Sequence, residues 1–297
     1  MYHTPVLLKE SVSGLNIVPE GVYVDLTFGG GGHSRAILSQ LGRGRLVAFD
    51  QDEESLENRL DDKRFLLLRQ NFRFLKYNLR YLGIREVDGV LADLGVSSHH
   101  FDEGARGFTY RADAVLDMRM NRAREMTAAD ILNAYTPDRL EQLFREYAEI
   151  GHPGRLVGLL VRAREAKPFR TVEDLLTALR PMTKGGPANR FLSRIFQALR
   201  IEVNEEMEAL KEMLIQVPQV LRKGGRLVVI SYHSLEDRLV KQFIRTGRFD
   251  GGEETGPFAG EEPPLRAVNR KVITPAPEET GKNPRARSAK LRIAEKI

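Results

Sequence analysis

The sequence contains no cysteine among its 297 residues. Disulfides, thiolate zinc sites and iron–sulfur clusters are therefore excluded. Every mechanism that uses a cysteine nucleophile is excluded as well. The adjacent His99 and His100 suggest a metal only faintly, since no further ligands stand at a useful spacing from them. We therefore expect no metal.

Long hydrophobic runs are also absent. No apolar stretch approaches the roughly 20 residues that a membrane span requires. The first ten residues have neither the charge order nor the length of a signal peptide, so we expect a cytoplasmic protein with no membrane contact. The content of 41% hydrophobic and 29% charged residues is ordinary for a globular chain, and the length suggests two domains of roughly 150 residues each.

Basic residues outnumber acidic ones, which gives a formal net charge of +5. A mildly basic chain suits a polyanionic partner, although the total charge discriminates weakly. The segment 282–292 contains five lysines and arginines and no acidic residue. A solvated tail and a nucleic-acid contact explain this segment about equally well from charge alone.

Short apolar runs alternate with helical stretches in the first hundred residues. This alternation predicts a parallel sheet covered by helices on both faces. The expected strands are 22–28, 45–50, 65–68 and 87–94, and the helices between them are 34–41, 53–60 and 74–82. After residue 200 the expected elements are a helix at 205–221, a strand at 226–232, a helix at 235–246 and an antiparallel pair, 267–273 with 289–294. The glycine- and acid-rich 247–264 predicts a loop.

Residues 102–200 show no convincing buried strand. They predict helices near 127–133, 137–147, 153–164, 171–179 and 188–199, with Thr127, Thr136 and Thr171 as N-caps. The simplest architecture is an α/β domain made of 1–101 and 201–297, with the helical domain 102–200 inserted after the fourth strand. An insertion there stands over the carboxyl ends of the strands, where open α/β sheets bind ligands. We therefore expect it to recognise the substrate.

A glycine-rich segment, Thr27–Ser34, lies between the first expected strand and its helix. Glycines there let the backbone adopt positive φ and approach a ligand closely. A nicotinamide site requires a third glycine further into the helix, but Ser34 or Arg35 occupies that position. The acidic strand ends at Asp25 and Asp50 fit a nucleoside instead.

Asp50 follows the glycines by about 20 residues, as expected of a carboxylate that accepts hydrogen bonds from both ribose hydroxyls. Asp52 is a close rival for this role. A tight turn followed by a surface carboxylate is the alternative explanation. The combination of strand, glycines, helix and acid favours S-adenosylmethionine as the cofactor.

Asp93 closes an otherwise apolar strand. An acid at such a position costs stability unless it has a partner, and the end of this strand faces the expected reaction centre. Ser97 and Ser98 follow at once. Phe72, after the third strand, has two interpretations, against the adenine face or in the core, and the sequence alone favours the core.

Eight segments, in order from end to end, share the features of one family. They are His3–Glu10, Phe28–Ser34, Asp93–Ser98, Arg106–Phe108, Leu116–Met120, Phe196–Ile201, Ser231–Arg238 and Asn283–Ser288. Asp-Met-Arg-Met and His-Ser-Leu-Glu-Asp-Arg, within the fifth and seventh segments, are unusual strings. Together the segments resemble the MraW family, ribosomal RNA small subunit methyltransferase H, which makes N4-methylcytidine in the decoding region of 16S ribosomal RNA.

The resemblance implies an α/β fold, the class I S-adenosylmethionine-dependent methyltransferase with a Rossmann-like sheet and an inserted all-helical domain. It also implies that 16S ribosomal RNA in the small subunit is the partner. The implied cofactor positions are Gly31, Gly32, His33, Asp50, Phe72, Asp93 and His100. The family usually has glutamine where His100 stands, and an imidazole can still donate or accept a hydrogen bond. Tyr232 replaces the commoner phenylalanine, which we expect to matter little.

The implied chemistry agrees with the absence of cysteine. The exocyclic amine of cytosine is a poor nucleophile, yet it requires no covalent adduct. It requires in-line placement at the sulfonium methyl and an acceptor for the amino group. Many amino-methylases have Asp/Asn-Pro-Pro-aromatic where this chain has Asp93-Leu94-Gly95-Val96, so no single general base is assigned. The candidates for orienting the base are Asp93, Ser97, Ser98 and His233.

The target base must be unstacked to reach a pocket. We expect the inserted helices and the basic segment to hold phosphates while this happens. The candidate RNA contacts are Arg119, Arg122, Arg124, Arg285 and Arg287, of which we expect half to be ordinary surface arginines.

Three alternatives remain open. A methyltransferase acting on another RNA base is the nearest. A catalytically silent RNA-binding assembly factor that keeps the fold is the second, and the intact glycines, Asp50 and Asp93 argue against it. A nicotinamide-dependent oxidoreductase is the third, and the missing third glycine argues against it.

Overall fold

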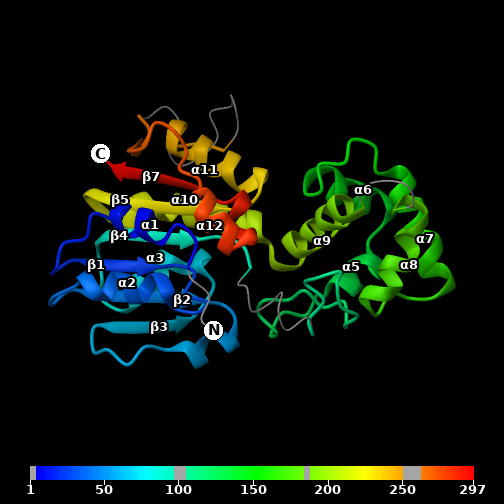
Figure 1. Cartoon of the computed structure of the whole chain (residues 1–297), viewed down its shortest axis with the longest axis horizontal. Coiled ribbons are helices and arrows are strands. Elements are labelled where there is room, and N and C mark those ends of the chain that lie inside the picture. The colour runs from blue at the N-terminus through cyan, green and yellow to red at the C-terminus, as the bar shows by residue number, and fades with distance from the viewer. Residues whose placement is uncertain (1–4, 97–104, 184–187, 250–261) are drawn as a thin grey trace. The chain divides into compact units, whose positions relative to one another are not determined.

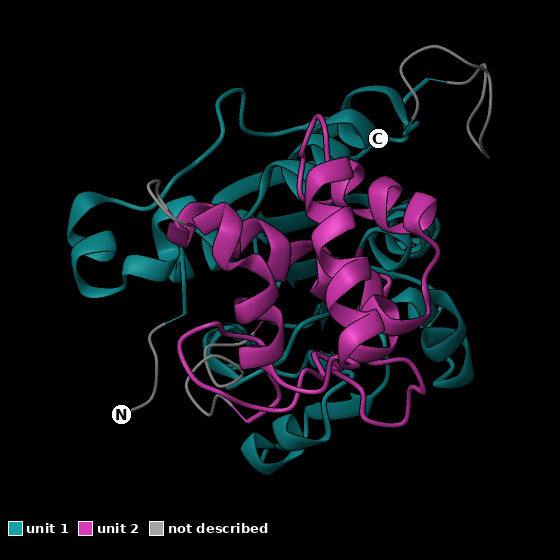
Figure 2. Cartoon of the chain, turned by 90° about the vertical axis from the view of Figure 1, so that its right-hand side faces the viewer, with its two compact units in different colours: residues 1–95, 207–297 teal, residues 96–206 magenta. Residues whose placement is uncertain are grey.

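The structure is a computed structural model that describes residues 5–96, 105–183, 188–249 and 262–297. The chain forms two compact units, one of Met1–Gly95 with Met207–Ile297 and the other of Val96–Glu206 (Figure 2). The expected domain boundaries were 101/102 and 200/201. The second unit ends further along the chain because helix α9 (Ala188–Asn204) continues unbroken past Arg200.

A seven-stranded sheet forms the centre of the first unit (Figure 1). Its order is β3-β2-β1-β4-β5-β7-β6, with the first five strands parallel and β7 antiparallel to both neighbours. The strand order reverses between β1 and β4, so the topological switch point lies there. The strands are β1 (Val22–Asp25), β2 (Arg45–Asp50), β3 (Phe65–Arg69), β4 (Val87–Asp93), β5 (Leu221–Ser231), β6 (Leu265–Ala267) and β7 (Lys290–Lys296).

The central strands are apolar because both faces of the sheet are buried. In β2, Leu46 and Ala48 join one hydrophobic cluster, and Val47 and Phe49 alternate with them toward the other face. All four side chains are buried. The prediction of a parallel sheet covered on both faces is confirmed.

Helices of the first unit pack on this sheet. α1 (Leu8–Gly14) and α2 (Gly32–Gln40) bury Val12 and Ile37 in the same cluster as Leu46. On α3 (Leu75–Tyr81) and α10 (Glu206–Val220), the Lys76 backbone N–H donates to Gln216, so these two helices lie side by side. α11 (Ser234–Thr246) contacts β5, β6 and β7.

Several elements differ from the expectation. The helix expected at 53–60 is the 3-10 helix η1 (Glu53–Asn58), and a second 3-10 turn, η2 (Phe72–Phe74), precedes α3. The closing antiparallel pair joins β7 to β6 rather than to the whole of 267–273, from which Ile273 makes only an isolated bridge to Leu291. Helices α1, α12 (Pro277–Lys282) and η3 (Pro284–Ser288) were not predicted, because they are short and weakly periodic. Most of the predicted loop 247–264 lies outside the described residues.

The second unit is helical, as predicted. Its helices are α5 (Ala128–Ala134), α6 (Pro137–Glu146), α7 (Gly154–Ala166), α8 (Val172–Thr183) and α9. The predicted caps are present: Thr127 forms a capping box with Asp130, and the Thr136 side chain accepts from a backbone N–H in the first turn of α6. Thr171 likewise accepts from the backbone N–H of Asp174.

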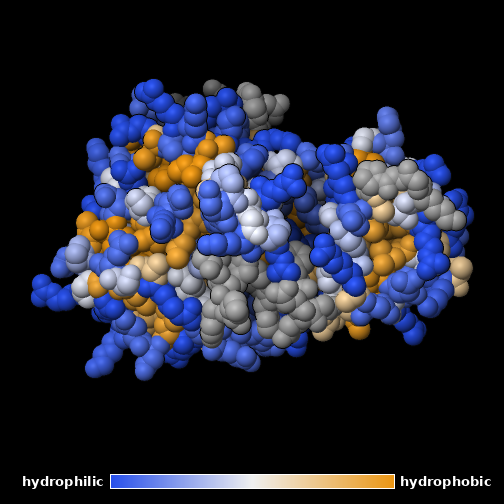
Figure 3. Space-filling model, in the orientation of Figure 1, coloured by the Kyte–Doolittle hydropathy of each residue, from blue (hydrophilic) through white to orange (hydrophobic). Residues whose placement is uncertain are grey.

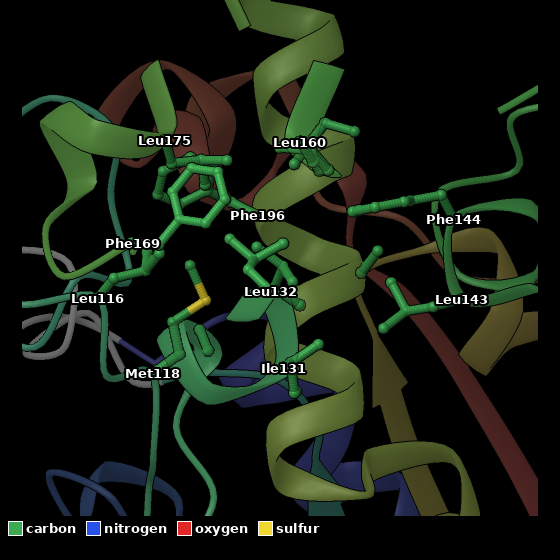
Figure 4. Close-up of a cluster of buried hydrophobic side chains, with 14 of the residues drawn as sticks. Leu116, Met118, Ile131, Leu132, Leu143, Phe144, Leu160, Phe169, Leu175 and Phe196 are labelled. Carbon is green, nitrogen blue, oxygen red and sulfur yellow. The ribbon is translucent and has the colours of Figure 1, made fainter. Parts of the chain in front are cut away.

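A separate hydrophobic core holds the second unit together (Figure 4). Leu132 of α5, Leu160 of α7 and Phe196 of α9 meet in it, and all three are buried. Because the unit buries its own apolar side chains, it has the core that defines a domain. Its role in substrate recognition is a proposal, taken up below.

The described residues contain no helix long and apolar enough to cross a membrane. The face of the molecule drawn in Figure 3 is largely hydrophilic, with apolar residues in separate patches.

Candidate active site

The turn between β1 and α2 depends on glycine. Gly31 has a φ of 74°, and a Cβ there would lie 2.8 Å from the ring of Phe28. A Cβ at Gly32 would lie 2.1 Å from the ring of Pro5. At Gly30 a Cβ would meet nothing within 4 Å. The chain itself therefore requires the glycines at 31 and 32, and the backbone at Gly30 stays open to a ligand.

Asp25, at the end of β1, holds this turn in place. Its side chain is wholly buried, and it accepts hydrogen bonds from the Ser34 hydroxyl at 2.7 Å and from the Thr27 backbone N–H at 3.1 Å. Burial raises the pKa of Asp25. The sequence suggested that Asp25 faces a nucleoside. The structure instead gives it an internal role, joining the end of β1 to the first turn of α2.

Asp25 ends β1 and Asp50 ends β2. Of these two carboxylates, Asp50 is the accessible one. It is half-buried, and it accepts hydrogen bonds from the backbone N–H of Gly29 at 2.8 Å and of Asp52 at 2.9 Å. These contacts fix the carboxylate at the end of the strand, where it stays partly exposed. Asp52 is buried and accepts from the backbone N–H of Glu54 as the cap of η1. The geometry favours Asp50 over its rival.

Asp93 ends β4 on the other side of β1 from Asp50. Its backbone N–H donates to the Thr27 hydroxyl at 2.7 Å, which joins β4 to the glycine turn. Its Oδ1 accepts a hydrogen bond from the Tyr232 hydroxyl at 2.7 Å. Its Oδ2 lies 3.7 Å from Nδ1 of His33, beyond hydrogen-bond distance. The side chain is 22% exposed, so this carboxylate is held in place and still reachable.

His33 lies in the first turn of α2 and is buried. Its Nε2 is 3.2 Å from the carbonyl oxygen of Val6, which can only accept, so Nε2 carries the proton. Burial lowers the pKa of His33, and the nearby Asp25 opposes this only in part. The imidazole is therefore neutral near pH 7, and its Nδ1 presents a lone pair on the side of Asp93.

Tyr232 follows β5, whose end lies beside the end of β4. Burial and the Asp93 carboxylate raise the pKa of Tyr232, so the phenol remains a hydrogen-bond donor. This tyrosine makes a contact that phenylalanine could not make, because phenylalanine has no hydroxyl to donate to Asp93. The sequence did carry a signal for this contact. It has tyrosine where the family commonly has phenylalanine, directly after a strand that neighbours the strand of Asp93.

Phe72 opens η2, directly after β3. It is half-buried and does not belong to the buried core, contrary to the interpretation that the sequence favoured. The ends of β3 and β2 are aligned, because the backbone of Arg69 lies in register with the backbone of Asp50. Phe72 thus follows the same edge of the sheet as the ribose candidate, which suits a ring against a nucleobase.

His233 is engaged as a helix cap. Its Nδ1 faces the backbone N–H of Glu236 at 3.5 Å, and the Glu236 carboxylate accepts in turn from the backbone N–H of His233. Its side chain is 8% exposed. These contacts fix the start of α11 and give His233 a structural task. The remaining candidates, Ser97, Ser98 and His100, lie outside the described residues.

The three candidate arginines of the second unit differ in their surroundings. Arg119 makes a two-pronged ion pair with Asp117, with nitrogen–oxygen distances of 2.7 and 2.8 Å. It also donates to the backbone carbonyl of Arg122. Arg124 pairs with Glu205 at 2.7 Å. Arg119 and Arg124 therefore make ion pairs within the unit, and the Arg122 side chain is exposed.

The basic segment near the C-terminus is part of the fold rather than a solvated tail. Lys290 and Arg292 belong to β7, and both pair with Asp237 of α11, at 3.1 and 2.7 Å. Arg285 and Arg287 lie on η3 and are exposed. Their contact with RNA stays a prediction.

The strand order, the glycine turn after β1 and the carboxylates that end β2 and β4 define the class I S-adenosylmethionine-dependent methyltransferases, and S-adenosylmethionine is the cofactor. Residues 1–297 match the family described as the MraW methylase family. This chain belongs to that family.

Its relatives are similar over their whole length. The chain is 54% identical over 296 residues to ribosomal RNA small subunit methyltransferase H of Bacteroides thetaiotaomicron, covering 99% of this chain and 97% of the relative. It is 56% identical over 298 residues to the protein of the same name from Parabacteroides distasonis, covering 100% and 98%. Among solved structures, a putative methyltransferase from Streptococcus mutans in complex with SAH is a distant likeness, with 12% identity, a TM-score of 0.45 and full coverage of both chains.

Proposed function

We propose that this protein transfers the methyl group of S-adenosylmethionine to the exocyclic N4 of a cytidine in the decoding region of 16S ribosomal RNA. The observation that carries the proposal is the Asp93 carboxylate, positioned by Tyr232 at the end of β4 beside the switch point of the sheet. The names of the two relatives support a small-subunit ribosomal RNA as the substrate. Such a substrate is met in the cytoplasm.

The residues that would hold the cofactor are grouped at one edge of the sheet. Asp50 offers a partly exposed carboxylate for the ribose hydroxyls, Phe72 offers a half-buried ring for the adenine, and the open backbone at Gly30 admits close approach. When bound, the cofactor supplies an electrophilic sulfonium methyl. Gly31, Gly32 and the buried His33 shape the turn that follows β1.

Asp93 is suited to accept a hydrogen bond from the amino group of the target base. An acceptor orients the amine in line with the methyl group, which is a proximity effect. Methyl transfer forms a nitrogen–carbon bond, breaks the sulfur–carbon bond and leaves an extra proton on the nitrogen. Asp93 is a carboxylate that can take this proton or pass it to water. No cysteine adduct is required, in agreement with the composition.

We propose that the helical unit 96–206 recognises the RNA. It has its own core, so it can present a surface without depending on the sheet for its fold. Of the arginines expected to contact RNA, the exposed Arg122, Arg285 and Arg287 remain the candidates. The ion pairs of Arg119 and Arg124 give these two residues a structural reason for their presence.

The decisive experiment supplies labelled S-adenosylmethionine and small ribosomal subunits that lack the modification, and then analyses the nucleosides. We expect label in N4-methylcytidine, and its loss in Asp93→Ala with the cofactor still bound. Label in another nucleoside would keep the enzyme class and overturn the choice of base. No transfer by a protein that binds the cofactor would favour an assembly factor without activity.

A further inference from the structure

Helix α3 and Phe74, the residue directly before it, carry a row of exposed aromatic side chains. Phe74, Tyr77 and Tyr81 are 47%, 72% and 83% exposed. Their spacing of three and then four residues places them on one side of the helix. Leu75 and Leu79, four residues apart, are fully buried on the opposite side. The buried side anchors the helix, so the aromatic row is a feature of the folded surface.

The aromatic row lies in a segment without acids. Residues 63–85 contain seven lysines and arginines and no aspartate or glutamate. Three of these cations pair with acids from outside the segment: Arg64 with Asp62, Arg69 with Glu53 and Arg73 with Glu212. The positive charge of α3 itself therefore depends on its own Lys76 and Arg80.

Two cations border the row. At about 100° per residue, Arg80 lies about 60° from Tyr77 around the helix, and Lys76 lies about 100° from Tyr77, between the aromatic row and the buried leucines. Both cations are exposed. Lys76 donates to the side chain of Gln219, an uncharged partner that leaves its charge unneutralised. Within the described part of the chain, Arg80 has no ion pair.

We propose that Phe74, Tyr77, Tyr81, Lys76 and Arg80 form a docking surface for a single-stranded segment of the RNA substrate, a proposal that rests on the function proposed above. Bases stack on the rings, which accept any base because each has an aromatic face, and phosphates lie along the two cations. This aromatic–basic surface begins two residues after Phe72, at the edge of the sheet that holds Asp50. It therefore continues from the cofactor site along α3.

The chemistry favours RNA over a protein partner. The exposed apolar side chains of α3 are rings, and its leucines at 75 and 79 are buried. Aromatic side chains and arginine are enriched in protein interfaces as well, so the rings alone do not choose between the partners. The choice rests on the cations beside the rings in a segment without acids, because stacking rings together with positive charge bind unpaired nucleotides.

The test is a binding titration of the full-length protein with a labelled, unstructured RNA oligonucleotide, alongside methyl transfer to small subunits. Tyr77→Ala/Tyr81→Ala is expected to weaken oligonucleotide binding about tenfold or more and to raise the KM for small subunits. Tyr77→Phe/Tyr81→Phe keeps the rings and should bind as the unchanged protein does. Both tyrosines are so exposed that neither change threatens the fold.

The charge is tested separately. Arg80→Gln should reduce the dependence of binding on salt by roughly one phosphate contact. Arg43→Gln, at an exposed arginine outside the acid-free segment, is the matched control and should leave the dependence unchanged.

Three outcomes would overturn the docking surface. The first is oligonucleotide affinity that survives loss of both rings, the second is equal effects of Arg80→Gln and Arg43→Gln, and the third is a dimer, seen by sedimentation, that the alanine variant dissociates. Failure of the proposed function would be seen separately. The unchanged protein would then produce no N4-methylcytidine, whereas the oligonucleotide titration would still test the docking surface.

Discussion

The hydroxyl of Tyr232 donates a hydrogen bond of 2.7 Å to the carboxylate of Asp93. The two residues end neighbouring parallel strands, and Asp93 pairs in register with Ile230 of β5. Sheet register therefore sets the distance between them. Because burial and the adjacent carboxylate raise the pKa of Tyr232, the phenol stays protonated across the pH range in which proteins are folded.

Tyr232→Phe removes this donor and keeps the ring. A hydrogen bond to a carboxylate favours its ionised form, so the acid limb of the pH–rate profile for methyl transfer should move to higher pH. The rate at neutral pH should fall by about tenfold or more, the scale of one hydrogen bond to a charged group. The measurement is single-turnover methyl transfer between pH 5 and pH 9.

A merely structural tyrosine would behave differently. Loss of packing would lower the midpoint of thermal unfolding and leave the shape of the pH–rate profile unchanged. An unaltered profile in Tyr232→Phe would show that the hydroxyl does not act on Asp93 during catalysis.

Asp50 and Asp52 provide a matched pair for the cofactor site. Asp50→Asn retains one acceptor for the backbone N–H of Gly29 and loses the charge that suits two ribose hydroxyls. We expect the dissociation constant for S-adenosylmethionine, measured by calorimetry, to rise about tenfold or more. Asp52→Asn should change it little, because Asp52 is the buried cap of η1. Equal losses of affinity in the two variants would contradict the assignment of the ribose role to Asp50.

The sheet could be predicted because its signals are local. Buried parallel strands such as β2 are continuous apolar runs, and their acidic ends are visible in the sequence. The caps at Thr127 and Thr136 were predicted for the same reason, since a cap involves residues only three positions apart.

The partners within the site could not be predicted, because they are distant in the sequence. Tyr232 and Asp93 are separated by 139 positions, and only the pairing of β4 with β5 brings them together. Asp25 looked like a ligand-binding acid because a sequence does not show that Ser34 and Thr27 enclose it. The basic segment looked like a tail because its partner, Asp237, lies on α11.

His33 should make stability depend on pH. Its pKa is lowered in the folded protein by burial, whereas the unfolded chain titrates near 6.5. As the pH falls below about 6.5, the unfolded state takes up a proton that the folded state does not, so the free energy of unfolding decreases, by at most about 1.4 kcal/mol per pH unit. The loss ends once the pH passes below the lowered pKa.

Denaturant titrations at pH 7 and pH 5.5 test this expectation. His33→Gln should reduce the difference in unfolding free energy between the two pH values, whatever it does to stability at pH 7. His152→Gln, at an exposed histidine, is the control and should leave the difference as it is. If the full pH dependence persists in His33→Gln, groups other than His33 cause it.

Arg119 and Arg287 separate the two tasks expected of arginines in this protein. Arg119→Gln leaves the Asp117 carboxylate without its two-pronged partner and removes a donor to the loop that includes Arg122. We expect a loss of about 1–3 kcal/mol in the free energy of unfolding, the scale of a polar group left without its hydrogen bonds.

Arg287→Gln changes an exposed side chain on η3 and should leave stability within about 0.5 kcal/mol. If Arg287 contacts a phosphate, its loss should weaken binding to the small subunit uniformly and make binding less dependent on salt. Denaturant titration and a salt series of RNA binding, applied to both variants, distinguish the roles. An Arg287→Gln variant that is unstable yet binds RNA with unchanged salt dependence would place Arg287 with the structural arginines.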